Sequence, residues 1–359
     1  MSLEELRKKI DETDDKIVRL IAERIKIAEE IGGEKRKQGK QIEDIAREKE
    51  VLKNIRNIAQ DEKISQEDIE RIYRQIMALS KSVEGTVVTF QGETGAYSEE
   101  AAFRFFSPSI QVKPCESVDD VFRAVEEAKA HFGIIPVENS LEGSINRSYD
   151  LLLDSKLMIY GETELRVSHC LIAAPGTGLD SIKRVYSHPQ ALGQCQAFIK
   201  QLNCESVSTY DTAGSVKMIK EKGIKDGAAI ASARAAEIYG MQIIAREIED
   251  NPNNYTRFFI LAGQDSPPSG NDKTSIVFSV KHKPGALYEF LQILASRDIN
   301  LTKIESRPTR QKPWEYNFYL DFEGHREDKT VQEVLEKLEK NSIFLKILGS
   351  YPRAKQKPM

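Results

Sequence analysis

The first 35 residues carry a single helical pattern, and this pattern constrains the fold more than any other feature of the chain. No proline or glycine interrupts it between Leu3 and Gly32. Apolar side chains recur at alternating steps of four and three residues, which is the spacing of one helix face. This stripe consists of Leu6, Ile10, Thr13, Ile17, Leu20, Arg24, Ile27 and Ile31. A helix over residues 3–35 would be roughly 50 Å long, and one chain has too little surface to cover its stripe. We therefore expect the long helices of two copies to pair.

Polar residues on this helix and on two predicted neighbours indicate a pocket. A second helix is expected over residues 42–59, and the sequence SQED at residues 65–68 is a capping box that opens a third. Arg24 occupies a stripe position, and Lys35 follows three turns later on the same face, roughly 16 Å along the axis. Ser80 lies on the apolar side of the third helix. Each residue alone would suit a solvated helix face, but together they favour a small polar site for an anion.

The stretches LRKKIDETDDKIVRLIAER and EKRKQGKQIEDIAREKEVL hold this spacing, and they resemble the all-helical chorismate mutases. The resemblance covers residues 3–84 and implies an intertwined dimer that binds the two carboxylates of chorismate with arginines. It assigns that role to Arg24 and to Arg7 of a second copy, since Arg7 lies about 100° from Arg24 around the helix. It places Lys35 at the ether oxygen, Arg47 and Ser80 at a carboxylate, and Asp44 and Glu48 at the ring hydroxyl. The rearrangement is intramolecular, so catalysis needs only to hold a compact conformer and stabilise charge at the breaking C–O bond.

Glu84 departs from this family, in which many members carry glutamine as the second donor to the ether oxygen. A carboxylate would repel the developing oxyanion, so only a protonated Glu84 could donate. We expect mutase activity to fall as the pH rises through the pKa of Glu84, and Glu84→Gln to flatten that profile. An unchanged profile would remove Glu84 from the site.

Composition excludes several functions. The chain has 359 residues, which suggests two or three domains. Its net charge of -4 is unlike the strongly basic surface of nucleic-acid-binding proteins. No secretion signal or membrane-spanning run is visible, so we expect a cytoplasmic protein that binds neither membrane nor nucleic acid. The cysteines show no C-x-x-C spacing, so we expect reduced thiols and no zinc site. They are Cys115, Cys170, Cys195 and Cys204.

From residue 86 the pattern changes to short apolar strand, polar loop and helix, repeated several times. TVVTF leads through QGETGAYSEE into AAFRFF, and IKRVYSHPQALGQCQAFIKQL and GAAIASARAAEIYG repeat the form. This alternation predicts an α/β domain, whose ligands gather where loops and helix N-termini follow the strands. The glycines form neither G-x-G-x-x-G nor a Walker loop, so no dinucleotide or ATP site is expected.

The strand NYTRFFIL places a charged arginine among aromatic residues. Alternation places Thr256 on one face and both Arg257 and Phe259 on the other. An unpaired arginine among aromatic rings would cost several kcal/mol. Two interpretations fit the segment alone. Arg257 pairs with Glu249 or Asp250 on an edge strand, or an anion or polar ligand lies at the start of the strand.

The loops GETGAYSEEAA, PVENSLEGSI and YSHPQALGQC, followed by NYTRF, resemble prephenate dehydratase over about residues 86–262. The resemblance implies two α/β subdomains around a cleft, as in a small periplasmic binding protein. Thr256 would face the cleft, with Arg257 behind it or near a carboxylate. Water leaves poorly unless it is protonated or hydrogen-bonded, and the family gives an essential part to this threonine, which we interpret as a donor in a relay. The resemblance makes Glu138 the ultimate acid and gives prephenate contacts to Ser98, Asn139, Ser187, Gln194, Thr256 and Arg257. Asp211, in TYDTAGS, departs from the family's Ser-Thr pair, and its role stays open.

The carboxyl-terminal segment reads as a regulatory domain. Its predicted order of strands and helices is βαββαβ, the ferredoxin-like arrangement of an α+β domain. PGALYEFL and NLTKIESRPT resemble the ACT domains that bind phenylalanine in prephenate dehydratases. The resemblance implies feedback inhibition through a site at a dimer interface. It assigns that site to Gly285, Ala286, Leu287, Asn300, Leu301, Glu305 and Ser306.

The three blocks divide the chain into residues 1–84, 85–263, a linker over 264–272, and 273–359. Together they resemble bifunctional chorismate mutase–prephenate dehydratases, which need no metal or organic cofactor and assemble as homodimers or higher homo-oligomers. Two alternatives remain. The dehydratase substrate could be arogenate, which carries an ammonium where prephenate has a keto group. The chain could also be a non-catalytic amino-acid-binding regulator, although Arg24 and Lys35 on an inward helix face argue against a mere scaffold.

Overall fold

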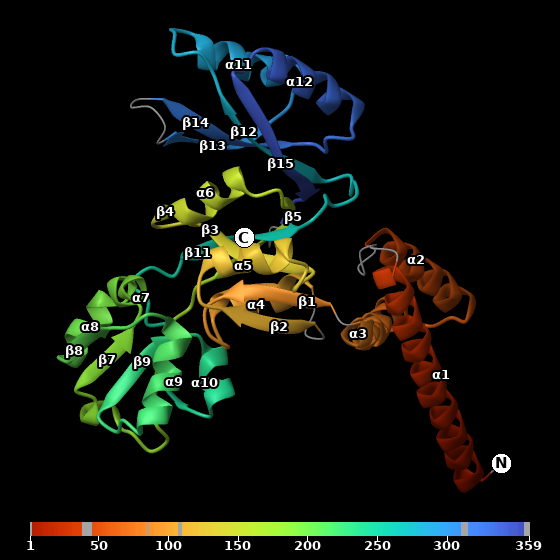
Figure 1. Cartoon of the computed structure of the whole chain (residues 1–359). Coiled ribbons are helices and arrows are strands. Elements are labelled where there is room, and N and C mark those ends of the chain that lie inside the picture. Colours follow the sequence, from red (N-terminus) through yellow and green to blue (C-terminus); the bar gives the residue numbers. More distant parts are fainter. Residues whose placement is uncertain (1, 38–44, 85, 107–109, 310–314, 355–359) are drawn as a thin grey trace. The chain divides into compact units, whose positions relative to one another are not determined.

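The computed structural model describes residues 2–37, 45–84, 86–106, 110–309 and 315–354 (Figure 1). Side chains are not described at positions 29, 32–37, 45, 46, 49 and 78–84. The chain divides into two compact units, residues 1–88 with 106–111 and residues 89–105 with 112–359. None of the helices in the described ranges combines the length and apolarity that crossing a bilayer requires.

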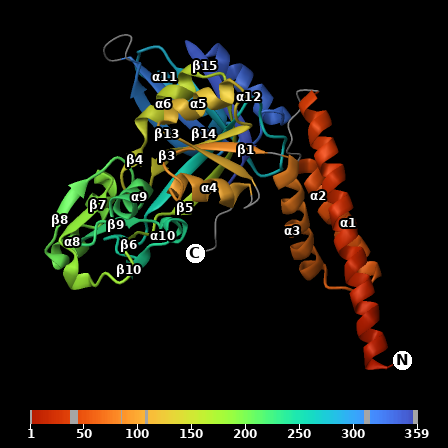
Figure 2. The ribbon, with the colours of Figure 1, turned by 60° about the horizontal axis from the view of Figure 1, so that its bottom comes forward.

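The first unit contains three helices, α1 (Leu3–Lys37), α2 (Ile45–Asp61) and α3 (Gln66–Glu84). Figure 2 shows α1 and α3 running alongside each other, and α3 also packs on α2. The predicted first helix is confirmed. The capping residue of α3 is confirmed as well, because the Asp68 amide donates to Ser65 Oγ at 3.3 Å. The expected start of the second helix, at residues 42–44, lies outside the described residues.

The apolar stripe of α1 is left exposed by the described residues of the helical unit. Leu20 is 63% exposed and Ile10 60%, and the other large apolar residues of the stripe are exposed as well. The side that α1 buries within the unit carries Ala28 instead, with Ile25 half-buried beside it. The helix therefore presents an apolar face that α2 and α3 of the same chain leave open.

The second unit contains two α/β lobes and a further sheet. The first lobe has the strand order β2-β1-β3-β11-β5, with β4 beside β3. Its strands are β1 (Val87–Gln91), β2 (Gln111–Cys115), β3 (Phe132–Asn139), β4 (Gly143–Ser144), β5 (Met158–Arg166) and β11 (Tyr255–Ala262). Its helices are α4 (Tyr97–Phe105), α5 (Val118–Glu126) and α6 (Asn146–Asp154), and all three contact β3. This packing explains why Ile134 and Ile135, which point to opposite faces of β3, are both fully buried.

The second lobe has the strand order β10-β6-β9-β7-β8. Its strands are β6 (Cys170–Ala173), β7 (Arg184–Ser187), β8 (Glu205–Ser208), β9 (Gly227–Ala231) and β10 (Gln242–Arg246). Its helices are η1 (Leu179–Ser181), α7 (Pro189–Gln194), α8 (Gln196–Leu202), α9 (Thr212–Lys222) and α10 (Ala233–Tyr239). The chain passes between the lobes at residues 167–169 and returns at 247–254. The predicted two-lobed α/β architecture is confirmed.

The C-terminal sheet confirms the predicted βαββαβ order. It comprises β12 (Asp272–Ser279), α11 (Ala286–Ala295), β13 (Leu301–Pro308), β14 (Tyr316–Glu323), α12 (Lys329–Lys340) and β15 (Phe344–Pro352). The strand order is β13-β14-β12-β15, and α11 and α12 lie together on one face (Figure 1). β15 also packs on β5 of the first lobe. At Gly349 the approach is so close that a Cβ atom would overlap the backbone of Ile159.

Candidate active site

A cavity of about 180 Å³ lies between the two lobes. Thr256 and Asn139, at neighbouring strand ends of the first lobe, line one side. Helices α7 and α9 of the second lobe begin on the other side. Its polar lining includes Tyr97, Ser98, Asn139, His169, His188, Gln194, Asp211 and Thr256. Both lobes therefore contribute polar groups to one cleft, as in ligand clefts of α/β proteins.

The Thr256 hydroxyl is held by the side chain of Asn139. The Leu141 and Glu142 amides donate to Asn139 Oδ1 at 3.0 and 3.1 Å, which turns Asn139 Nδ2 toward Thr256. Asn139 Nδ2 donates to Thr256 Oγ1 at 3.1 Å. The hydroxyl is therefore an acceptor in this contact, and among the described residues no acceptor takes its hydrogen. A substrate oxygen in the cavity can receive that hydrogen.

A buried chain of amides extends from Asn139 toward the second lobe. Asn139 Nδ2 also donates to Asn254 Oδ1 at 2.7 Å, and Asn254 Nδ2 donates to Gln194 Oε1 at 3.0 Å. Gln194 Nε2 donates to Glu142 at 3.0 Å, which fixes the orientation of its amide. The Nε2 atom of His169 lies 2.9 Å from the same Gln194 Oε1 and must carry the hydrogen of that contact. Gln194 thus links the first lobe, both connecting segments and α7.

The two sides of the cavity differ in charge. Among the described residues that line it there is no lysine or arginine. The first turn of α4, at Tyr97 and Ser98, presents the positive end of a helix dipole. At the second lobe Asp211 caps α9, and its Oδ1 accepts from the Gly214 amide at 2.7 Å. Burial raises the pKa of Asp211, and the negative charge of Glu93 adds to this shift.

Four of the predicted prephenate contacts line this cavity together: Ser98, Asn139, Gln194 and Thr256. Ser187 does not. It is fully buried and donates to the Ile230 carbonyl at 2.6 Å, so its hydroxyl satisfies a backbone group between β7 and β9. This placement gives no support to its predicted contact with prephenate, which stays a prediction.

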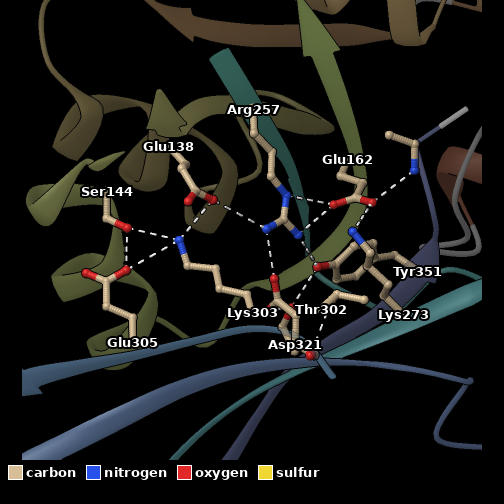
Figure 3. Close-up of polar contacts among 12 residues, drawn as sticks. Glu138, Ser144, Glu162, Arg257, Lys273, Thr302, Lys303, Glu305, Asp321 and Tyr351 are labelled. Atoms are coloured by element: carbon tan, nitrogen blue, oxygen red, sulfur yellow. Dashed lines mark hydrogen bonds and ion pairs between the residues drawn. The ribbon is translucent and has the colours of Figure 1, made fainter. Parts of the chain in front are cut away.

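Arg257 lies on the opposite face of β11 from Thr256, as alternation predicts, but it does not line the cavity. Its guanidinium lies 2.6 Å from Glu162 and 2.8 Å from Asp321 of β14 (Figure 3). Burial alone would lower the pKa of Arg257, but Asp321 and its neighbours raise it well above the ordinary value. The expected pairing with Glu249 or Asp250 is wrong, whereas the expectation that Arg257 lies behind Thr256 or near a carboxylate agrees with these contacts. Its predicted contact with prephenate stays a prediction.

Glu138 belongs to the same cluster behind the cavity. Its carboxylate lies 2.9 Å from Lys303 of β13 and 3.8 Å from Arg257 (Figure 3). Glu138 is engaged by cations and is not part of the cavity lining, so this placement gives no support to the expected role of ultimate acid, which stays a prediction. Among the described residues that line the cavity, Asp211 carries the carboxyl group.

The predicted mutase residues are only partly described. Arg7 is exposed, Arg24 and Glu48 are half-buried, and Arg47 is exposed and pairs with Glu50 at 2.6 Å. Asp44 lies outside the described residues, and the side chains of Lys35, Ser80 and Glu84 lie outside them too. The described part of one chain therefore does not bring this set together.

The predicted phenylalanine residues fall into two groups. Ala286 and Leu287, in the first turn of α11, line a cavity of about 770 Å³ with Phe318, Phe344 and Asp154. Gly285 precedes them with a φ of 81°, a conformation that suits glycine. The members on or beside β13 do not line this cavity: they are Asn300, Leu301, Glu305 and Ser306. Asn300 donates to Glu323, and Glu305 contacts Ser144 on the dehydratase side and Lys303 on its own strand.

Sequence analysis missed Asn254 and His169. Asn254 opens the NYTRF segment, and its place in that motif is the signal that the sequence offered; the structure shows the residue fully buried. His169 is 2% exposed and its Nδ1 lies 3.0 Å from the Tyr97 hydroxyl. Nothing in the local sequence marks it, because its partners come from α4 and α7.

Family models match three consecutive parts of the chain: chorismate mutase type II over residues 6–85, prephenate dehydratase over 88–266 and the ACT domain over 274–340. A curated relative from Aquifex aeolicus, a bifunctional chorismate mutase/prephenate dehydratase, is 39% identical, with 98% of each chain covered. An Arabidopsis thaliana protein named arogenate dehydratase/prephenate dehydratase 2 is 46% identical over 74% of this chain and 72% of its own.

Two solved structures resemble the second unit. One, described as GqqA, a novel type of quorum quenching acylase, has a TM-score of 0.69 at 36% identity, and covers 75% of this chain and 98% of its own. The other is prephenate dehydratase in complex with L-Phe from Arthrobacter aurescens, with a TM-score of 0.69 at 33% identity over 76% of this chain and 92% of its own. The order of the three domains and the full-length match to the Aquifex relative establish that this chain belongs to the family of bifunctional chorismate mutase/prephenate dehydratases.

Proposed function

We propose that this chain converts chorismate to prephenate in its helical domain and prephenate to phenylpyruvate in the cavity between its lobes, under feedback control by phenylalanine. The observation that carries the dehydratase assignment is the Thr256 hydroxyl, which Asn139 holds at 3.1 Å with its own hydrogen left for a ligand. The test is conversion of chorismate to phenylpyruvate by the purified chain, with and without phenylalanine.

In the dehydratase step the bond between the ring and its carboxylate breaks, carbon dioxide leaves, and the electron pair enters the ring. The hydroxyl on the opposite ring carbon departs and takes up a proton to become water. Thr256 donates a hydrogen bond to this departing oxygen, where negative charge develops. Ser98 and Asn139 line the same cavity as Thr256, and the first turn of α4 adds the positive end of a helix dipole to that lining.

In the mutase step two copies of the chain hold chorismate between helices. Arg24, Arg47 and Ser80, with Arg7 of the second copy, bind its carboxylates. Lys35 and a protonated Glu84 face the ether oxygen, and Asp44 and Glu48 address the ring hydroxyl. The exposed apolar stripe of α1 supports this dimer, because a second α1 would bury residues that are open in one chain.

The phenylalanine effect belongs to the ACT domain. The 770 Å³ cavity beside α11 offers what a free aromatic amino acid requires: apolar walls at Leu287 and Phe318, a carboxylate at Asp154 for an ammonium, and Lys281 for a carboxylate. The residues of β13 named above complete the site if a second copy supplies them.

A second candidate substrate for the dehydratase is arogenate, here called the amino analogue of prephenate. The name of the Arabidopsis relative includes both activities, and the two substrates differ only in a keto group against an ammonium. The observation that favours this candidate is the Asp211 carboxylate in a cavity whose described lining has no lysine or arginine. Side-by-side turnover of both substrates distinguishes them.

A further inference from the structure

Asp211 is the charged group at the second-lobe side of the cavity. It caps α9, an 11-residue helix, through its Oδ1 contact with Gly214. Since Asp211 already occupies the N-terminus of α9, that helix end presents a negative side chain to the cavity. No lysine or arginine in the described part of the chain forms an ion pair with it.

The other acidic residues near the cavity already have hydrogen-bond or ion-pair partners. Glu93 comes near Asp211 from the first lobe, but it pairs with Lys217 at 3.1 Å and accepts from the Tyr210 hydroxyl at 2.9 Å. Glu142 accepts from Gln194. Among the described residues, Asp211 is therefore the carboxylate that lines the cavity without a lysine or arginine partner, and His188 is the titratable group whose positive form would oppose the rise in its pKa.

The shape of the substrate determines which of its groups meets Asp211. The departing hydroxyl and the three-carbon side chain of prephenate are attached to opposite carbons of the six-membered ring. With the hydroxyl at Thr256 in the first lobe, the side chain extends toward the second lobe, where α9 begins. The group that distinguishes a keto acid from an amino acid then lies at the Asp211 end.

We propose that Asp211 binds the ammonium of the amino analogue and is the residue that lets this chain dehydrate a 2-amino acid as well as prephenate. This inference rests on the proposed dehydratase function. The bonds that break are those of the prephenate reaction: carbon dioxide and water leave, and the product is phenylalanine.

The surroundings of Asp211 support this assignment. Burial raises its pKa, which means that the ionised carboxylate is poorly compensated by its surroundings. An ammonium placed beside it supplies the missing counter-charge through a charge-assisted hydrogen bond. A keto oxygen offers no hydrogen to the same carboxylate, so Asp211 discriminates in favour of the amino analogue.

The test compares kcat/KM for the two substrates in the full-length chain and in Asp211→Asn, using initial rates because the product phenylalanine is the proposed effector. Asparagine retains the helix cap, so the substitution removes charge and not structure. We expect the unaltered chain to turn over both substrates. In Asp211→Asn the ratio of kcat/KM, amino analogue over prephenate, should fall at least fivefold, chiefly through the KM of the amino analogue. Glu93→Gln, which removes a nearby charge outside the lining, should change the ratio less than twofold.

Asp211→Ser, which also caps a helix, keeps the test decisive if the asparagine variant does not fold. Failure of the unaltered chain to use the amino analogue while it uses prephenate overturns the inference, as does a change in the ratio of less than fivefold. Turnover of neither substrate would instead defeat the proposed dehydratase function itself.

Discussion

The Arg257 guanidinium lies 2.8 Å from the Asp321 carboxylate, and this contact joins the strand that carries Thr256 to the ACT domain. Both side chains are nearly buried, with 11% and 8% exposed. Thr256 precedes Arg257 in the chain and points to the opposite face of β11. At this end of β11, Thr256 therefore lines the cavity and Arg257 contacts the ACT domain.

Removal of the Thr256 hydroxyl should eliminate the dehydratase and leave the mutase. Thr256→Ala loses the donor to the departing oxygen, and loss of one such donor lowers kcat by about 100- to 1,000-fold. Both activities are measured on the same preparation, from chorismate loss and phenylpyruvate formation. Thr256→Ser, which keeps a hydroxyl, should recover part of the dehydratase activity. Retention of full dehydratase activity in the alanine variant would contradict the role given to Thr256.

Asp321→Asn should destabilise the protein at neutral pH and much less in acid. Burial alone would raise the pKa of Asp321, but Arg257 and the Ser275 hydroxyl lower it below its ordinary value. Its carboxylate thus adds stability above the ordinary pKa of 3.8, and this is lost as the pH falls through the lower folded value. Breaking a buried pair costs about 3 kcal/mol of unfolding free energy.

Denaturant melts at pH 7 and near pH 3 measure this difference, with the exposed Asp180→Asn as a control that leaves stability unchanged. A destabilisation of equal size at both pH values would show that charge pairing is not its cause.

Lys303→Met should weaken phenylalanine inhibition while phenylalanine still binds. Lys303 joins β13 to the β3–β4 hairpin through Glu138 and Ser144, each at 2.9 Å, and this hairpin carries Asn139 (Figure 3). We expect the phenylalanine concentration for half inhibition to rise at least fivefold, with the calorimetric Kd nearly unchanged.

Lys346→Met is the matched control for this experiment. Lys346 also crosses from the ACT domain to the first lobe, where it donates to the carbonyls of Leu152, Leu153 and Ser155 at the end of α6. It does not contact the hairpin. Equal loss of inhibition in both variants would mean that general loosening of the interface, and not the Lys303 contact, causes the effect.

Leu20→Lys should separate the proposed dimer of the helical domain and abolish mutase activity, because it places a charge in the centre of the α1 stripe. Sedimentation velocity measures the assembly, and chorismate consumption measures the activity. Val18→Lys, at an equally exposed position off the stripe, should change neither. A Leu20→Lys variant with unaltered assembly and full mutase activity would contradict pairing through this face.

Features that depend on neighbouring residues could be predicted from the sequence. Contacts between residues far apart in the chain could not. The period of α1, the cap at Ser65 and the face of Thr256 all follow from neighbouring residues. For Arg257 the sequence suggested partners seven or eight residues away, yet its partners Glu162 and Asp321 lie far along the chain, and Asp321 lies in another domain. Motif membership also did not reveal that the Ser187 hydroxyl bonds to backbone, because that partner comes from another strand.

The close approach of Gly349 to Ile159 has a mechanical consequence. There is no room for even a methyl group between β15 and β5, so any side chain at position 349 would force these two strands apart. Glycine at this position therefore lets the backbone of the regulatory sheet pack directly on the backbone of the first lobe.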